Sequence, residues 1–541
     1  MRLTLAAALL ALCSSGPVSA ATVIAKTPDG MLQGEVVRKL HVFRGISYAQ
    51  APVGALRWRP PVPVPKWSGI REARKFGPAC VQPKVRPGSI YTWELPPTSE
   101  DCLSLNVTAP ADARGAPVFF WIHGGALTTG VGSDPLYDAS ELAGRGLVVV
   151  TINYRMGVLG YLAHPQLSAE SADNVSGNYG LLDQIAALTW VKRNIAAFGG
   201  DASQVTIAGE SAGGLSVMYL MAAPSARGLF ARAIAESAYM ISTPELRSRT
   251  HGDLAQEAIG TWLADKLGAR DIAALRAMDA TQITNAAAGA GYLPFGSVDG
   301  KVLPWQIVEA FDRGEQARVP ILAGFNSGEI RSLRYLLPPR PADAATYERE
   351  IRARYADLAT AFLERYPATD LDQSMLATTR DAMYGWTAER LVAKQTAIAM
   401  PSYLYLWDHA YPAADEHGLH AFHASELPYV FGTADKTPPD WPKVPATTAE
   451  RTLAAAMTDY WASFAREGAP RAQGQADWHP YGRERAYLWV AEQPRSSTHV
   501  LPGMYELVEQ VVCRERAHGG IPWNWNVGLA LPPLPPTAHC R

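Results

Sequence analysis

The chain has 541 residues, of which 48% are hydrophobic and 18% are charged. Its length allows roughly three or four domains of average size, although α/β enzymes often form one larger unit. The composition excludes a disordered chain, which would be poor in hydrophobic residues and rich in net charge. The formal net charge of −2 argues against nucleic-acid binding, because proteins that bind nucleic acids carry a basic surface.

The N-terminal segment has the pattern of a secretory signal peptide spanning residues 1–20. Arg2 gives it a basic start, an unbroken apolar run covers residues 5–13, and small residues at Ala20 and Ala21 offer a cleavage site. Such a run is too short to span a bilayer, and no later stretch is long and apolar enough for a membrane span. The alternative is a buried N-terminal helix. The pattern favours a protein that is secreted or periplasmic.

The cysteines agree with export. Cys13 would leave with the signal peptide, and the other four are Cys80, Cys102, Cys513 and Cys540. Four cysteines allow three pairings. The simplest joins nearest neighbours in sequence, Cys80 with Cys102 and Cys513 with Cys540. The alternative is that the four are unpaired buried thiols. Disulfides persist in oxidising compartments, so export and pairing support each other. None of the four stands in C-x-x-C spacing, which argues against a zinc or redox motif.

Short runs of apolar, β-branched or aromatic residues recur along the chain and predict buried strands. In chain order they are residues 118–122, 147–152, 205–208, 231–235, 319–323, 403–407 and 486–490. Segments with helical periodicity lie between several of them, including residues 181–198, 253–267 and 347–366. Nearly all-apolar strands that alternate with helices indicate a mostly parallel sheet with helices on both faces. The predicted fold class is therefore α/β.

A candidate nucleophile follows the strand at 205–208. Residues 209–213 read Gly-Glu-Ser-Ala-Gly, fit the pattern G-x-S-x-G, and precede a helical segment at 214–221. This strand–turn–helix setting is what a nucleophile elbow requires, with glycines where strand and helix come close together. The alternative is an ordinary turn between a strand and a helix. The setting predicts Ser211 as the nucleophile.

A glycine-rich loop follows the strand at 118–122. Residues 123–126 read His-Gly-Gly-Ala. A serine nucleophile needs a base for its proton and donors for the developing oxyanion. Loops of this kind supply backbone N–H donors in esterases and lipases. The alternative is a plain glycine turn, but the position one strand–helix unit before the elbow region favours an oxyanion hole.

Together with further motifs, these stretches resemble the type-B carboxylesterases, the cholinesterase-like branch of the α/β-hydrolases. The similar stretches are residues 43–49, 52–54, 56–57, 100–106, 153–160, 177–184 and 198–214. Ser104 stands where the family usually has Tyr or Thr. The resemblance covers nearly all of the mature chain. It implies an α/β-hydrolase fold, with residues 22–541 as one large domain whose long loops form an active-site gorge.

The resemblance also implies the rest of a catalytic triad. The acid is Glu329, in a turn where Gly328 replaces the usual Asp, and the base is His423. The chain order Ser211, Glu329, His423 is the one expected of an α/β-hydrolase. The oxyanion hole would be formed by the N–H groups of Gly125, Ala126 and Ala212.

The function implied is that of a secreted serine carboxylesterase, which hydrolyses a small-molecule ester through an acyl-enzyme without a metal or organic cofactor. His423 would take the proton of Ser211, and Glu329 would hold the imidazole in the right tautomer. Two alternatives stay open. One is a catalytically inactive binding or adhesion protein of the same fold, and the other is a lipase that acts on long-chain esters. The complete triad and the lack of an evident lid favour the esterase.

Two other groups of residues are candidates for chemistry. His417, His420 and His423 form H-x-x-H-x-x-H, but residues with this spacing drift off one helix face and would converge poorly on a metal. We therefore expect the first two to be loop or surface residues. Glu210 is too close to Ser211 in sequence to support the histidine as the triad acid.

Three aromatic residues are candidates for contacts with substrate. In the family, the first disulfide closes a loop that forms part of the gorge wall. Cys80 and Cys102 match it, with Trp93 inside the loop. Tyr292 and Phe295 are candidates for the acyl side of the site. Packing within the loop explains Trp93 equally well. The supply of aromatic residues favours a bulky or aromatic ester and predicts nothing more specific.

Overall fold

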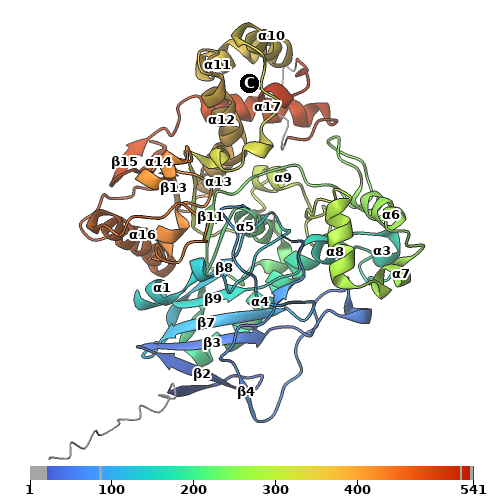
Figure 1. The fold of residues 1–541 in the computed structure, drawn as a ribbon, viewed down its shortest axis with the longest axis vertical. Helices are drawn as coiled ribbons and strands as arrows, with labels where there is room; N and C mark the ends of the chain where they lie inside the picture. The colour runs from blue at the N-terminus through green and yellow to red at the C-terminus, as the bar shows by residue number, and fades with distance from the viewer. Residues whose placement is uncertain (1–20, 85–87, 524–526, 537–539, 541) are drawn as a thin grey trace, which may run out of the picture.

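The computed structural model describes residues 21–84, 88–523, 527–536 and 540. Its centre is a mixed 13-stranded sheet (Figure 1). The strands of this sheet are β1 Thr22–Lys26, β2 Met31–Val37, β3 Leu40–Ser47, β4 Ile70–Glu72, β7 Ser104–Pro110, β8 Ala116–Ile122, β9 Val148–Ile152, β10 Gly200–Glu210, β11 Arg232–Glu236, β12 Ile321–Asn326, β13 Ser402–Trp407, β14 Ala486–Val490 and β15 Pro494–Thr498. Two further strands, β5 Ala79–Cys80 and β6 Thr98–Ser99, pair with each other.

The middle of the sheet is parallel. The strand order is β1-β2-β3-β7-β9-β8-β10-β11-β12-β13-β14-β15, with β4 beside β2. The pairs from β9 to β14 are all parallel, whereas β1, β2, β3 and β7 form an antiparallel flank and β15 an antiparallel edge. The seven strands predicted from apolar runs are the seven of this parallel part, so the predicted α/β class is confirmed.

Strand β8 shows why these runs are apolar throughout. Val118, Phe120 and Ile122 belong to the hydrophobic core on one side of the sheet, whereas Phe119 and Trp121 belong to the core on the other side. All five are fully buried. A strand covered on both faces cannot alternate apolar and polar residues, and this distinguishes it from the flanking strand β2, whose burial alternates.

The described residues also form helices, some of which cover the two faces of the sheet. They are α1 Ser140–Gly144, α2 Gly157–Tyr161, α3 Pro165–Ala169, α4 Tyr179–Asn194, α5 Ala212–Ala222, α6 Gln256–Lys266, α7 Ile272–Ala277, α8 Ala280–Gly289, α9 Ile307–Asp312, α10 Ala344–Tyr355, α11 Ala359–Arg365, α12 Leu371–Arg380, α13 Trp386–Ala397, α14 Pro412–Glu416, α15 Leu427–Val430, α16 Thr448–Glu467 and α17 Met504–His518. Helices α4, α5 and α13 pack on one face, and α1 and α16 on the other. Helices α10, α11, α12 and α17 gather at the top of Figure 1 around a core of their own. Within the described residues, no helix combines the length and the apolar character needed to cross a membrane.

One predicted helix is wrong in extent. The segment 347–366 was expected to be continuous, but α10 ends at Tyr355 and α11 begins at Ala359. Ala356 between them has a φ of 49°, outside the helical region. Tertiary contacts fix the break: the Leu534 N–H donates to the Arg354 carbonyl oxygen at 2.8 Å, and Asp357 pairs with Arg514 at 2.6 Å. Distant parts of the chain thus override a local helical pattern.

Both nearest-neighbour disulfides are present. Cys80 bonds to Cys102, and Cys513, on α17, bonds to Cys540. The first closes the loop between β5 and β7, and the second ties the end of the chain to the helices at the top of Figure 1. The predicted signal peptide, residues 1–20, lies outside the described residues.

Candidate active site

Ser211 stands on a sharp turn between β10 and α5. Its backbone has φ 57° and ψ −120°, a conformation that non-glycine residues rarely adopt. The Ser211 N–H donates to the Glu236 carbonyl oxygen at 2.9 Å, which fixes the turn against the neighbouring strand β11. Strained residues held by their surroundings cluster at active sites. The turn has the strand–turn–helix setting of a nucleophile elbow.

Glycines allow the strand and the helix to meet at this turn. A Cβ atom on Gly213 would lie 2.1 Å from the carbonyl oxygen of Ile122, and one on Gly209 would lie 2.6 Å from the backbone of Gly213. Both distances are far inside van der Waals contact, and the opposing atoms belong to backbone that cannot swing away. The two glycines of the G-x-S-x-G pattern are therefore required by packing.

Substitution of Gly213 by alanine is expected to destabilise the protein by about 3 kcal/mol or more, the upper range for overpacking of a core. The added methyl group must displace strand β8 at Ile122. Chemical denaturation of the purified variant measures the effect. Gly289→Ala, at the end of α8, is the matched control, because nothing lies within 4 Å of its added Cβ. Equal stability of the two variants would show that the contact at Gly213 relaxes without cost.

The glycine-rich loop lies beside Ser211. A Cβ atom on Gly124 would lie 3.2 Å from the Cβ of Ser211. The loop is shaped by a turn in which the N–H groups of Thr128 and Thr129 both donate to the Gly125 carbonyl oxygen at 2.9 Å. The Gly125 carbonyl oxygen is thus bonded within the loop, whereas the N–H groups of Gly125 and Ala126 are not.

Several backbone N–H groups around Ser211 are without an acceptor among the described residues. They include those of Gly125, Ala126 and Ala212. Ala212 is the first residue of α5, where helix geometry leaves the N–H unpaired. Ala126 has a φ of 56°, which turns its peptide away from a regular strand. The N–H groups of Gly125, Ala126 and Ala212 are therefore able to donate to a ligand beside Ser211.

Glu329 and His423 are joined by a hydrogen bond. Glu329 begins a 3-10 turn, Glu329–Arg331, just after β12, and its side chain is fully buried. One carboxylate oxygen accepts from the Asn326 N–H at 2.9 Å, and the other accepts from His423 Nδ1. With Nδ1 donating, Nε2 carries the lone pair of a neutral imidazole and can accept a proton.

Hydrogen bonds join the loop that carries Glu329 to the loop that carries His423. The Gly328 N–H donates to the Ala421 carbonyl oxygen at 2.8 Å, and Asn326 Nδ2 donates to the Phe422 carbonyl oxygen at 2.8 Å. A Cβ atom on Gly328 would lie 2.8 Å from the carbonyl oxygens of both Ala421 and Leu419. This close approach explains why glycine stands where the family usually has aspartate.

Glu210 occupies the other side of the imidazole. Its Oε1 lies 3.1 Å from His423 Nε2, a contact that sequence reasoning missed because it considered Glu210 only as the triad acid. Among the described residues no hydrogen bond joins Ser211 Oγ to His423. Catalytic hydrogen bonds often form only when substrate is bound.

The buried carboxylates set the charge state of the histidine. Burial alone would lower the pKa of His423, but Glu210 and Glu329 raise it to about 9. Burial raises the pKa of Glu210 to about 7, although His423 opposes the rise. Burial also raises the pKa of Glu426 to about 8 and that of Glu236 well above its ordinary value. The carboxylates therefore favour the protonated imidazole, and activity should fall as the pH is lowered because a charged His423 cannot accept a proton.

Glu210→Gln is expected to move the acid limb of the kcat/KM profile to lower pH by about one unit or more, the effect of losing a charge partner at contact distance. The sign follows from the role of His423 as a base: a lower pKa leaves it neutral at lower pH. Rates on p-nitrophenyl acetate across acid to alkaline pH measure the shift. Glu467→Gln, at the exposed end of α16, is the control that should leave the profile unchanged. A profile unmoved by Glu210→Gln would contradict the electrostatic role.

Aromatic residues pack around the imidazole. Tyr91 donates from its hydroxyl to the His423 carbonyl oxygen at 2.9 Å, and the Tyr384 ring centroid lies 5.2 Å from that of His423. Tyr91 belongs to the loop closed by Cys80 and Cys102, so this loop does reach the site, through a residue that sequence reasoning did not name.

The three aromatic residues proposed from the sequence as substrate contacts make no described contact with His423. Trp93 is half-buried, and its Nε1 has no hydrogen-bond partner among the described residues. Tyr292 is buried in the core cluster that α6, α7 and α8 share. Phe295 packs against the main core. Packing thus accounts for Tyr292 and Phe295, and no described contact joins the three to the imidazole.

The other histidines of the H-x-x-H-x-x-H stretch have separate partners. His417 Nδ1 is 2.7 Å from the Ala413 carbonyl oxygen, in the last turn of α14. His420 lies between Asp408 and Asp415, at 3.2 Å from each. Both are at least partly exposed, as predicted.

Comparison with known proteins identifies the family of the chain. A model of the carboxylesterase family matches residues 21–506. A fumonisin B1 esterase of Sphingopyxis macrogoltabida is 36% identical over 500 residues, covering 88% of each chain. A para-nitrobenzyl esterase of Bacillus subtilis (strain 168) is 36% identical over 472 residues, covering 85% of this chain and 93% of that one. A solved PNB esterase structure aligns with a TM-score of 0.77 at 30% identity, over 90% of this chain and 99% of the other. The chain therefore belongs to the carboxylesterase family and is an α/β-hydrolase that hydrolyses carboxylic esters.

Proposed function

We propose that this protein hydrolyses its ester with Ser211 as nucleophile, His423 as general base and Glu329 as the acid of a Ser-His-Glu triad. The observation that carries the proposal is the buried Glu329–His423 hydrogen bond, which leaves Nε2 facing the Glu210–Ser211 turn. We further propose that residues 22–541 work as one hydrolase unit after removal of a signal peptide, in the periplasm or outside the cell.

In the first half of the reaction, His423 Nε2 takes the Ser211 proton as Oγ attacks the ester carbonyl carbon. Glu329 keeps the proton of the neutral imidazole on Nδ1 and stabilises the imidazolium that forms. Glu210, at contact distance from Nε2, adds to that stabilisation. The tetrahedral intermediate collapses when the imidazolium gives its proton to the leaving alcohol oxygen, which leaves an acyl group on Ser211.

The oxyanion of the intermediate would accept from the three free N–H groups of Gly125, Ala126 and Ala212. Preorganised backbone donors need no reorientation as charge develops, and the loss of one such donor typically costs about 10²–10³ in kcat. In the second half, water attacks the acyl group with His423 again as base, and Ser211 leaves as the free hydroxyl. The carboxylic acid is then released.

For substrate class, we propose soluble esters of moderate size in preference to long-chain lipids. Relatives that share most of the chain are named for fumonisin B1 and para-nitrobenzyl esters. A panel of p-nitrophenyl esters of rising acyl length, measured below the concentration at which the longer ones form micelles, tests this. We expect kcat/KM to be highest for short acyl chains. A steady rise to the longest chain, with activation at a lipid surface, would favour the lipase instead.

A further inference from the structure

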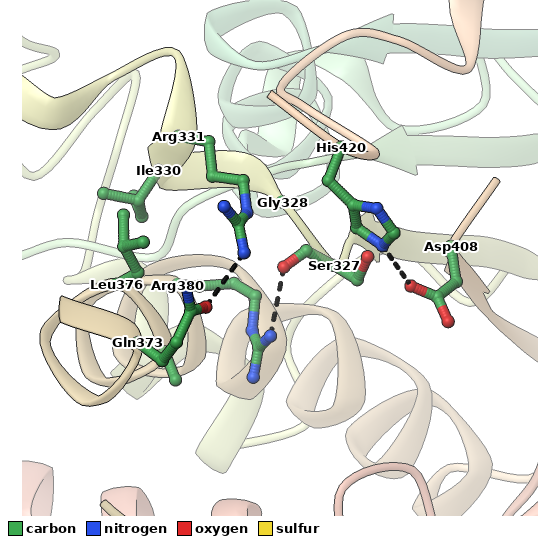
Figure 2. Close-up of a pocket in the computed structure, with 10 residues that line it drawn as sticks. Ser327, Gly328, Ile330, Arg331, Gln373, Leu376, Arg380, Asp408 and His420 are labelled. Carbon is green, nitrogen blue, oxygen red and sulfur yellow. Dashed lines mark hydrogen bonds and ion pairs between the residues drawn. The ribbon is translucent and has the colours of Figure 1, made fainter. Parts of the chain in front are cut away.

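A polar cavity lies behind the turn that carries Glu329. It encloses about 230 Å³, and Figure 2 shows the side chains around it. The turn at residues 327–331 forms one wall, α12 forms a second, and the loop before His423, with the end of β13, forms a third. The polar side chains on these walls are Ser327, Arg331, Gln373, Arg380, Asp408 and His420.

Arg331 supplies a positive charge that no carboxylate neutralises by direct contact among the described residues. Its guanidinium donates to the Gly418 carbonyl oxygen at 3.2 Å and to Gln373 Oε1 at 2.9 Å. In Figure 2 this guanidinium and the Gln373 amide point toward each other across one end of the cavity. Donors of both groups remain free, because a guanidinium has five N–H bonds and a carboxamide two.

The other charged side chains on the walls each contact a group that can carry the opposite charge. Arg380 pairs with the buried Asp381 at 2.6 Å, and it donates to the Ser327 carbonyl oxygen at 3.0 Å. Asp408 faces the cavity too, but it accepts from Trp489 Nε1 at 2.9 Å and contacts His420 at 3.2 Å. His420 in turn contacts Asp415. Arg331 is therefore the charged side chain of this lining that no opposite charge contacts directly, whereas Asp408 and Asp415 share the single partner His420.

We propose that this cavity binds a small carboxylate or phosphate anion, held by the Arg331 guanidinium and the Gln373 amide with Arg380 at its side. A guanidinium matches the two oxygens of such an anion with parallel hydrogen bonds. The volume suits a ligand smaller than a drug-sized molecule, whose pockets measure about 300–1,000 Å³.

The site sits on the same backbone that aligns the triad. Gly328 directly precedes Glu329, and its N–H donates to Ala421, two residues before His423. An anion held between the Glu329 turn and α12 therefore changes how firmly that turn is held against the His423 loop. Given the proposed function, which this step assumes, occupancy of the cavity alters kcat. The acid product of ester hydrolysis carries the required carboxylate.

The binding test uses para-fluorobenzoate, titrated into the full-length mature chain and followed by fluorine NMR. Wild-type protein is expected to bind it, and Arg331→Gln to bind it about tenfold or more weakly, as for a lost charge-assisted hydrogen bond. Gln373→Glu, which places a carboxylate beside Arg331, gives the same loss through a different change. Inorganic phosphate should displace the probe if phosphate is also a ligand; failure to do so restricts the site to carboxylates.

Arg334→Gln is the matched control, because Arg334 is exposed and contacts Asp372 instead of the cavity. It should bind para-fluorobenzoate like the wild type, and the neutral para-fluorobenzyl alcohol should not bind at all. Equal affinity of the wild type and Arg331→Gln overturns the proposal. Binding through Arg331 in a chain that hydrolyses no ester would uphold the anion site and refute the proposed function.

Kinetics test the link to catalysis. At saturating p-nitrophenyl acetate, sodium benzoate compared with sodium chloride of equal ionic strength should change kcat of the wild type and of Arg334→Gln. The same salt should leave kcat of Arg331→Gln unchanged. A benzoate effect on KM alone, equal in all three proteins, would place the acid in the active site and overturn the coupling.

Discussion

Replacement of Ser211 by alanine is expected to lower kcat for p-nitrophenyl acetate by about 10⁶, the loss typical when the nucleophile of a serine hydrolase triad is removed. Alanine has no group that can attack the carbonyl or hold the acyl intermediate. The fold should persist, because the strained turn is held by the Ser211 N–H bond to Glu236 and by the flanking glycines, none of which involves the hydroxyl. Residual hydrolysis would come from the free N–H donors and from binding alone.

Ser203→Ala provides the matched control. Ser203 lies on the same strand, β10, where its exposed hydroxyl contacts Asp201. This variant should keep wild-type kcat, and circular dichroism should show all three proteins folded. If the folded Ser211→Ala variant retains substantial turnover, another residue is the nucleophile, and the assignment of the elbow is wrong.

Glu329→Gln is expected to lower kcat by about 10⁴, as when the triad carboxylate of a serine protease is replaced by its amide. The glutamine amide can fill the same space and keep a bond to Asn326. Its nitrogen, however, would donate toward His423 Nδ1 and stabilise the wrong tautomer, with the proton on Nε2. The imidazolium would also lose the carboxylate that contacts it.

Glu426→Gln separates this effect from a general loss of negative charge. Glu426 is equally buried, but it contacts Asn326 and not the imidazole. Burial raises the pKa of Glu426 and favours its neutral form, which the amide resembles. A much smaller loss in kcat is expected. Similar losses in the two variants would mean that Glu329 has no special place at the histidine.

The sequence predicts the parallel centre of the fold well because burial on both faces leaves a plain signal. Strand β9, for example, is buried over Val148–Ile152 and consists of β-branched residues, all of them apolar except Thr151. The antiparallel flank is harder to predict. Strand β2 is only partly buried, and its partners are set by pairing with β1 and β3, which a single run of residues does not reveal. The break at Ala356 depends on contacts of Arg354 with Leu534 and of Asp357 with Arg514, which lie far along the chain.

Some residues of the candidate site can likewise be predicted from local sequence, and others cannot. Ser211 and the glycine loop carry local signals, because a sharp turn and a close backbone approach each demand particular residues. Glu329 and His423 have no such signal and were inferred from family resemblance; the structure brings them into contact. The place of Glu210 beside Nε2 follows from where the His423 loop packs, which no local pattern records. For the same reason Tyr91, and not Trp93, is the loop residue that contacts His423.

The most direct test of the account is the site of covalent labelling by an organophosphate ester, located by mass spectrometry of proteolytic peptides. We expect stoichiometric labelling of Ser211 in the wild type, parallel loss of ester hydrolysis, and no labelling of Ser211→Ala. Labelling should also be much slower in Glu329→Gln, because the nucleophile is activated through His423. A label on another residue, or full hydrolysis by a protein whose Ser211 is blocked, would contradict the proposed mechanism.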